Sequence, residues 1–220
     1  MIKQAIIPLA GLGTRLLPLT SVFAKELLPI NGKPGIEYIL DECINAGIKE
    51  VIFIISQKKL MIKEYFYNDK FYKDIIKKKK DPRIIQEYKK ILKYKKMIKF
   101  VFQDKPLGTG DAVLKTKKYI KNKYFLMLLP DDLIIKNNCS KSMIAVHKKY
   151  NSSVMASMKV NKKEVSRWGI YSVKNKVDKN NFTIKNVVEK PSIKLAPSNN
   201  AVIGRYILPK TIFNKLSKLK

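Results

Sequence analysis

The chain of 220 residues has little cysteine and almost no histidine: two cysteines, Cys43 and Cys139, and one histidine, His147. These counts exclude the usual zinc sites, which need three or four such ligands. Neither cysteine has another Cys or His close by in the sequence, so we expect reduced, semi-buried thiols. His147 lies in the helically spaced segment MIAVHKKY and is expected at the surface or its boundary. Any metal site must then use carboxylate oxygens, which favours Mg²⁺ or a similar hard cation.

Long hydrophobic runs are also missing. No apolar stretch approaches the roughly 20 residues that a membrane helix needs. The N-terminus, MIKQAIIPLAG, is too short for a signal peptide and is interrupted by Pro8. We therefore expect no membrane partner and a cytoplasmic protein.

Acidic residues are scarce, with 17 Asp and Glu against 46 Lys and Arg, so the formal net charge is +29. Three explanations of this charge are open. The protein binds nucleic acid, it handles anionic substrates such as triphosphates, or the charge only reflects a genome whose A/T-rich codons favour Lys, Ile and Asn. The lysines are spread along the whole chain, and arginine, the better reader of bases, is rare. Nucleic acid is thus disfavoured as a partner, although charge alone does not separate the three explanations.

The order of the segments predicts an α/β fold. Residues 2–9 form an apolar run that ends in a Gly-rich turn, as a buried strand would. Residues 34–50 show helical spacing and end near Gly47, and the run 51–56 is typical of a strand covered on both faces. A strand, helix and strand within fifty residues form a βαβ unit, which predicts parallel pairing.

The rest of the chain continues the alternation. We expect helices over 58–97, interrupted at Pro82, whose lysines form a solvated face or an exposed loop. The other expected elements are strands at 97–103, 123–132, 153–160 and 201–208, helices at 111–120 and 141–151, and a hairpin-like stretch at 168–188. No repeat or linker is visible. We therefore predict a single domain over 1–220, a Rossmann-like α/β fold with a mostly parallel, mixed sheet and helices on both faces.

The loop after the first expected strand, AGLGTRLLPLTSVFAKELLPI, carries the clearest chemical signal. Its glycines let backbone N–H groups approach phosphate oxygens, and Arg15 and Lys25 add two positive charges. A Walker loop would need GxxxxGKS or GxxxxGKT, and a dinucleotide loop would need a third glycine where Leu16 stands. A GxG alone also suits a tight turn. With its two cations, the loop suits a triphosphate that is attacked at its α-phosphate.

AGLGTRLLP followed by AKELLPI closely resembles the N-terminal signature of bacterial UTP–glucose-1-phosphate uridylyltransferases, which are sugar-phosphate nucleotidyltransferases. The middle leucine, Leu12, favours this branch over the wider superfamily with its AGGxGTRL. The resemblance continues in order through PLGTGDAV (106–113), LLPDD (128–132), VVEKP (187–191) and APSNNAVIGRYIL (196–208). It covers essentially the whole chain and implies a nucleotidyltransferase-type fold. The implied enzyme makes UDP-glucose and pyrophosphate from UTP and glucose 1-phosphate.

The resemblance also implies roles for single residues and Mg²⁺ as cofactor. The catalytic cations that hold the phosphates would be Arg15 and Lys25. The nucleotide would be bound by Ala10, Gly11, Gly13, Gln103 and Gly108. The sugar phosphate would be bound by Gly169, Glu189 and Lys190, and the metal by Asp131.

Elementary chemistry agrees with several of these roles. The carboxamide of Gln103 has both a donor and an acceptor, as the imide edge of uracil requires. Asp131 follows a buried strand, and open α/β sheets bind ligands beyond the carboxyl ends of their strands. Asp132 is expected to be a supporting or capping acid. On physical grounds Glu189 and Lys190 also suit a surface salt bridge. Core packing is the expected role of the neighbouring aromatic residues Trp168 and Tyr206.

Two features depart from the family pattern. Asp111 stands where these enzymes often carry His or a small residue, although a helix N-terminus would stabilise its charge. Family members also continue through a GDEIQLTDA-like helix to a later aspartate, the second magnesium ligand, which matches no residue here. Two alternatives stay open: another sugar-1-phosphate nucleotidyltransferase, of the thymidylyl type, or a truncated, inactive basic binding module. The resemblance also leaves a homo-oligomer open.

Overall fold

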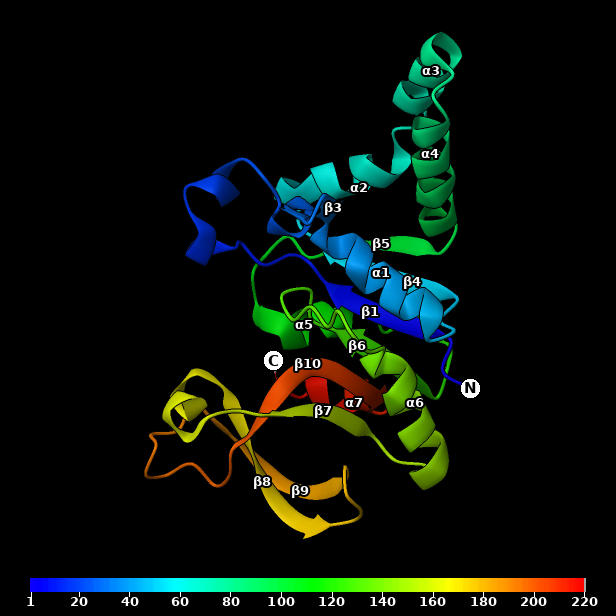
Figure 1. Cartoon of the computed structure of the whole chain (residues 1–220). Helices are drawn as coiled ribbons and strands as arrows, with labels where there is room; N and C mark the ends of the chain where they lie inside the picture. The colour runs from blue at the N-terminus through cyan, green and yellow to red at the C-terminus, as the bar shows by residue number, and fades with distance from the viewer. Residues whose placement is uncertain (220) are drawn as a thin grey trace.

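The computed structural model describes residues 1–219 and contains an eight-stranded sheet with helices on both faces (Figure 1). Across the sheet the strand order is β5-β4-β1-β6-β10-β8-β9, and β7 pairs with β10. The strands are Gln4–Pro8 (β1), Glu50–Ile55 (β4), Ile98–Phe102 (β5), Tyr124–Leu128 (β6), Val154–Lys159 (β7), Gly169–Lys176 (β8), Phe182–Glu189 (β9) and Asn200–Pro209 (β10). The helices are Gly35–Asn45 (α1), Leu60–Tyr67 (α2), Asp69–Lys79 (α3), Pro82–Lys95 (α4), Gly108–Lys115 (α5), Cys139–Tyr150 (α6) and Ile212–Leu216 (α7).

The first half of the sheet is parallel. Strand β1 pairs with β4 and β6, and β4 pairs with β5, all in parallel. Residues 51–55 of β4 are completely buried, which explains their unbroken apolar sequence. The predicted βαβ unit is confirmed as β1-α1-β4. Because these four strands run in one direction, the loops that follow them emerge at the same edge of the sheet.

The second half is antiparallel, so the sheet is mixed as expected. Strand β10 pairs antiparallel with β6, β7 and β8, and β8 pairs antiparallel with β9. The hairpin-like stretch at 168–188 is confirmed as the β8–β9 hairpin. Only residues 177–181 connect these two strands, which is too short for the crossover that parallel pairing requires.

Each face of the sheet has its own hydrophobic core. Helices α1, α2, α4 and α6 supply apolar side chains to one face, and α5 and α7 supply them to the other. A third, smaller cluster around Val165 and Ile170 lies at the start of β8. Cys43 and Cys139 are both free thiols, as expected, but Cys43 lies fully inside the first core rather than half-buried.

The Lys-rich segment forms a helical hairpin that projects from the body of the molecule (Figure 1). Helix α3 contains no buried residue, in agreement with a solvated lysine face. The chain turns at Lys80, which has a left-handed backbone (φ 49°). Helix α4 then begins at Pro82, where the Asp81 carboxylate accepts a hydrogen bond from the Arg83 N–H at 2.8 Å. The predicted interruption is confirmed.

Two parts of the fold differ from expectation. The helix predicted at 111–120 covers Gly108–Lys115, and the Thr116 hydroxyl donates to the Val113 carbonyl at 2.6 Å, a local bond that competes with helix continuation. The loop at 10–34 contains three 3₁₀ turns and a two-stranded ribbon, Thr14–Leu16 (η1), Leu19–Ser21 (η2), Lys25–Leu27 (η3), Pro29–Ile30 (β2) and Lys33–Pro34 (β3).

Within residues 1–219, no helix combines the length and apolar character needed to cross a bilayer.

Candidate active site

Topology gathers the predicted site residues at one edge of the sheet. The loop 10–25 follows β1, Gln103 follows β5 and Asp131 follows β6, all at strand carboxyl ends. Strand β10 runs the other way, so its first residues meet the same edge, where Ala201 pairs with Ile170 of β8. Residues far apart in the sequence therefore approach one another by the rule that places ligands at this edge.

The loop after β1 is held in one shape around Gly13. This glycine has a left-handed backbone (φ 70°), and its carbonyl accepts a hydrogen bond from the Thr20 hydroxyl at 2.8 Å. A Cβ atom there would lie 3.1 Å from Thr20 Cγ2 and 3.5 Å from Lys25 Cδ. Gly11 differs, because its Cβ position has no neighbour within 4 Å. Its backbone is exposed and accessible to a ligand.

The structure brings only one of the two predicted cations to the predicted metal ligand. Lys25 Nζ lies 3.6 Å from Asp131 Oδ2, and the Asp131 side chain is 59% exposed. Arg15 lies exposed on the 3₁₀ turn η1 and forms no ion pair with any residue in 1–219. Lys25 therefore lies beside Asp131 at the sheet edge, while the Arg15 side chain is exposed to solvent on η1.

A buried ion pair that the sequence did not reveal supports Lys25. Lys59, on the 3₁₀ turn Gln57–Lys59 (η4) after β4, contacts both carboxylate oxygens of Glu26 at 2.8 Å. The two side chains are 8% and 1% exposed. Burial lowers the pKa of Lys59, and the Glu26 carboxylate opposes that shift. Glu26 is the direct neighbour of Lys25, so the pair fixes the backbone from which Lys25 extends.

A second buried network fastens the chain on both sides of Asp131. The Arg205 guanidinium, which is 0% exposed, donates to the carbonyls of Leu129 at 3.0 Å and Asp132 at 2.7 Å. Of its remaining N–H groups, one donates to the Gly204 carbonyl at 2.9 Å and the others contact the Glu42 carboxylate of α1 at 2.8–3.1 Å. In the sequence, Arg205 stands out only as part of the GRYIL motif. Nothing in its sequence neighbourhood predicts that it pairs with Glu42.

Asp132 fills the supporting role expected for it. Its Oδ2 atom accepts a hydrogen bond from the Gly204 N–H at 2.6 Å, which ties the loop to β10. Burial and then the carboxylates of Asp132, Glu189 and Asp131 raise the pKa of the Tyr206 phenol. Tyr206 packs against the core on the α5 side of the sheet, as expected.

Gln103 is oriented by two acceptors. Its Nε2 group donates to the Gly108 carbonyl at 3.1 Å and to Asp111 Oδ2 at 2.8 Å. Gly108 itself has a left-handed backbone (φ 86°). The sequence suggested that Gln103 would offer a base both a donor and an acceptor. In the folded chain both amide protons are already used, so the side-chain carbonyl alone remains.

The predicted sugar-phosphate residues form a separate group at the β8–β9 pairing. Gly169 pairs with Glu189, and a Cβ atom on Gly169 would lie 3.1 Å from Glu189 Oε2. Lys190 has a left-handed backbone (φ 45°), and its N–H donates to the Trp168 carbonyl at 3.0 Å. Its Nζ lies 3.8 Å from Glu189 Oε1, so the two exposed side chains also form the surface pair considered from the sequence. Trp168 packs against the third cluster, as expected.

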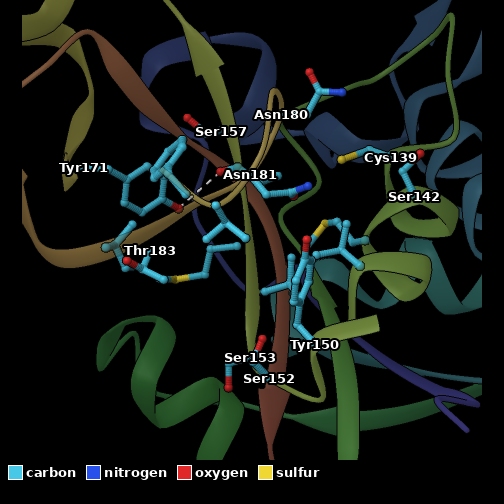
Figure 2. A pocket seen from close by; sticks show the side chains of 18 residues that line it. Cys139, Ser142, Tyr150, Ser152, Ser153, Ser157, Tyr171, Asn180, Asn181 and Thr183 are labelled. Atoms are coloured by element: carbon cyan, nitrogen blue, oxygen red, sulfur yellow. Dashed lines mark hydrogen bonds between the residues drawn. The ribbon is translucent and has the colours of Figure 1, made fainter. Parts of the chain in front are cut away.

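A cavity of about 750 Å³ lies away from these residues, between α6, β7 and the β8–β9 hairpin. Figure 2 shows Tyr150, Tyr171 and Asn181 among the side chains that line it. None of its lining side chains is Lys, Arg, Asp or Glu, and none belongs to the predicted site. It therefore lacks the charged groups that a triphosphate or a metal ion requires.

Comparison with known proteins identifies the family. The sequence matches the nucleotidyl transferase family over residues 4–220. The chain is 36% identical to UTP–glucose-1-phosphate uridylyltransferases of Streptococcus pyogenes, across 99% of this chain and 72% of that protein, and of Staphylococcus saprophyticus, across 99% and 75%. The chain therefore belongs to the nucleotidyl transferase family, as an enzyme of its uridylyltransferase group.

Solved structures similar to this chain support the same family and fold. A UDP-glucose pyrophosphorylase in complex with UDP-glucose is 35% identical with a TM-score of 0.85, and the match covers 99% of this chain and 80% of that one. The UTP-bound enzyme of Acinetobacter baumannii is 33% identical with a TM-score of 0.89, over 97% and 76%. The predicted family and fold class are confirmed.

Proposed function

We propose that this chain transfers a uridylyl group from UTP to glucose 1-phosphate and produces UDP-glucose and pyrophosphate. The observation that best supports this function is that three features lie at one edge of the sheet. They are the Lys25–Asp131 pair (3.6 Å), the glycine loop after β1, and Gln103 after β5. Two solved relatives are described as bound to UDP-glucose and to UTP, a product and a substrate of this reaction. The relatives and the site chemistry thus support the same substrates.

In the proposed reaction, an oxygen of glucose 1-phosphate attacks the α-phosphorus of UTP, and pyrophosphate departs on the opposite side. No covalent enzyme intermediate is needed, so catalysis consists of positioning and charge stabilisation. Arg15 and Lys25 offset negative charge on the phosphates, and exposed backbone in the glycine loop donates to them. The proposed base and loop contacts are Ala10, Gly11, Gly13, Gln103 and Gly108, and the proposed sugar-phosphate contacts are Gly169, Glu189 and Lys190.

We also propose Mg²⁺ as the cofactor, held by Asp131. Residues 1–219 contain no cluster of three or more His, Cys, Asp or Glu suited to a metal ion. One exposed carboxylate nevertheless fits Mg²⁺, which commonly uses one or two carboxylates and takes its other ligands from water and substrate phosphates. When bound, Mg²⁺ neutralises charge that develops on the phosphate oxygens.

A substrate panel tests the proposal. Pyrophosphate release is measured with UTP, dTTP, CTP, ATP and GTP, each with and without glucose 1-phosphate and Mg²⁺. We expect release that requires UTP, the sugar phosphate and the metal together. Higher turnover with dTTP would reassign the chain to thymidylyl transfer, and no release with any triphosphate would contradict the proposed activity. The cytoplasmic location belongs to the same proposal and is tested by cell fractionation.

Arg15→Ala should lower kcat by about 10²–10³-fold with only a modest change in substrate affinity, because its charge is expected to act mainly on the transition state. Arg167→Ala is the matched control, since Arg167 is exposed and pairs only with the nearby Glu164 in residues 1–219. Steady-state kinetics with UTP check the prediction. An unchanged kcat in Arg15→Ala would remove Arg15 from the site.

A further inference from the structure

The donor and acceptor ends of the Gln103 side chain are fixed by its surroundings. Gln103 is 5% exposed, and its Nε2 group lies 3.1 Å from the Gly108 carbonyl and 2.8 Å from Asp111 Oδ2. A carbonyl and a carboxylate only accept hydrogen bonds. A flipped amide would direct its oxygen at both, so the contacts themselves establish which end is nitrogen.

The remaining polar atom of Gln103 is available to a ligand. Within residues 1–219, Gln103 Oε1 accepts no hydrogen bond and is not among the polar atoms sealed from solvent without a partner. Oε1 is therefore an acceptor at the sheet edge that is accessible to solvent and has no hydrogen-bond donor from the described residues. The base that satisfies it must offer an N–H group.

Uracil and thymine carry such a group at N3, whereas cytosine has a lone pair at the same position. An acceptor facing uracil makes a hydrogen bond, and the same acceptor facing cytosine meets a second acceptor. A site that leaves a polar group unpaired against the wrong ligand discriminates strongly. The fixed amide thus distinguishes an imide edge from a cytosine edge.

We propose that Asp111 is a positioning residue for base selection, which holds Gln103 so that only its carbonyl faces the base and thereby favours UTP over CTP. This inference rests on the proposed function. Asp111 lies in the first turn of α5, where the helix dipole favours a carboxylate. Its charge also strengthens the contact with Nε2, since hydrogen bonds to ionised acceptors are stronger than neutral ones. Gly108 alone would leave the second amide proton free and the amide less constrained.

The test measures binding of UTP, CTP and dTTP, each with Mg²⁺, by titration calorimetry on the full chain and on Asp111→Ala and Asp111→Asn. We expect the UTP-to-CTP affinity ratio to fall about tenfold in Asp111→Ala, the loss expected from one charge-assisted hydrogen bond, and by less in Asp111→Asn, which keeps a neutral acceptor for Nε2. The UTP-to-dTTP ratio should stay unchanged, because both bases present the same N3–H. Asp104→Asn is the matched control, since Asp104 is exposed on the same segment and makes no hydrogen bond within residues 1–219.

Three results overturn the inference. The first is an unchanged UTP-to-CTP ratio in both Asp111 variants while the wild type binds and turns over UTP, which leaves the proposed function standing. The second is an equal loss for all three nucleotides together with a lower unfolding temperature, which assigns Asp111 a purely structural role. The third is a wild-type chain that binds no UTP, which removes the proposed function as well.

Discussion

Gly204 lies in β10 beneath the loop that carries Asp131, and its N–H donates to the Asp132 carboxylate. A Cβ atom at this position would lie 2.5 Å from Leu129 Cβ and 2.8 Å from Asp132 Oδ2. Leu129 Cβ is attached to the backbone and cannot move without it, so the close approach of loop and strand requires glycine. This single residue therefore helps to set the position of the proposed metal ligand.

Gly204→Ala should lower the free energy of unfolding by about 1–3 kcal/mol, the usual cost of overpacking. Urea unfolding followed by circular dichroism measures the change. Gly11→Ala is the control, because a Cβ at Gly11 meets nothing within 4 Å. Equal unfolding free energies for Gly204→Ala and the wild type would contradict this prediction, because they would show that the loop moves away from the added Cβ without loss of stability.

At the scale of elements, the turn η4 and helix α2 hold the loop that bears Lys25. The Lys59–Glu26 pair joins η4 to η3, and the Ala24 N–H contacts the Met61 sulfur at 3.1 Å. The two buried charges have each lost their water, and each is satisfied mainly by the other. Removing one charge should therefore disturb the loop more than removing both.

Lys59→Met should cost about 3–5 kcal/mol of unfolding free energy, because it leaves the Glu26 carboxylate buried without a partner. The double variant Lys59→Met/Glu26→Leu should recover most of that loss. Lys58→Met, which alters an exposed neighbour, serves as control. Denaturant unfolding of the wild type, both single variants (Lys59→Met and Glu26→Leu) and the double variant gives the coupling energy. A double variant as unstable as the sum of the two singles would contradict the prediction.

The β8–β9 turn depends on one ionised side chain. The Asp178 carboxylate accepts hydrogen bonds from the Asn181 side chain, the Asn180 N–H and the Tyr150 hydroxyl, which lower its pKa to about 2 from an ordinary 3.8. Since the folded-state pKa is depressed, the carboxylate stabilises the fold fully above about pH 4. Its contribution is lost as the pH falls from about 4 to 2.

Asp178→Ala should therefore be less stable than the wild type at neutral pH, and the difference should shrink between about pH 4 and pH 2. Urea unfolding at a series of pH values measures it. Asp74→Ala is the control, since Asp74 is exposed and makes no hydrogen bond or ion pair within residues 1–219. A difference independent of pH would mean that the carboxylate charge is not what stabilises the turn.

At the scale of the whole molecule, the net charge of +29 is the dominant property. Lysines on α3 and α4 gather on a projecting hairpin with few acids to offset them (Figure 1). Such an excess of one sign destabilises the compact state by self-repulsion, and salt screens it over about 10 Å at 0.1 M.

Raising NaCl from about 20 to 300 mM should raise the unfolding temperature by a few degrees, because the Debye length falls to several ångströms. Differential scanning calorimetry measures the shift, and KCl at equal ionic strength should give the same result. A falling unfolding temperature would contradict the prediction. The same scans test the predicted single domain over 1–220, which requires one cooperative transition.

Much of the fold could be predicted from the sequence because it depends on neighbours along the chain. The apolar run 51–56 predicts a buried strand, and Pro82 predicts the interruption between α3 and α4, since the burial pattern and the backbone restriction by proline are local properties. The motifs from AGLGTRLLP to GRYIL likewise identified the family without coordinates. Helix α5 ends earlier than predicted, next to the hydrogen bond from the Thr116 hydroxyl to the Val113 carbonyl. That bond is one of several local hydrogen bonds that the sequence allows, so it could not be predicted.

The partners of charged side chains were decided only by the tertiary structure. Arg205 and Glu42 are 163 residues apart and Lys59 and Glu26 are 33 apart, and in a lysine-rich chain no local pattern distinguishes these residues from exposed ones. The orientation of Gln103 is a similar case, because it depends on where Gly108 and Asp111 place their oxygens. Local sequence determines secondary structure, but buried charge pairs depend on which elements pack together, and packing is a property of the whole chain.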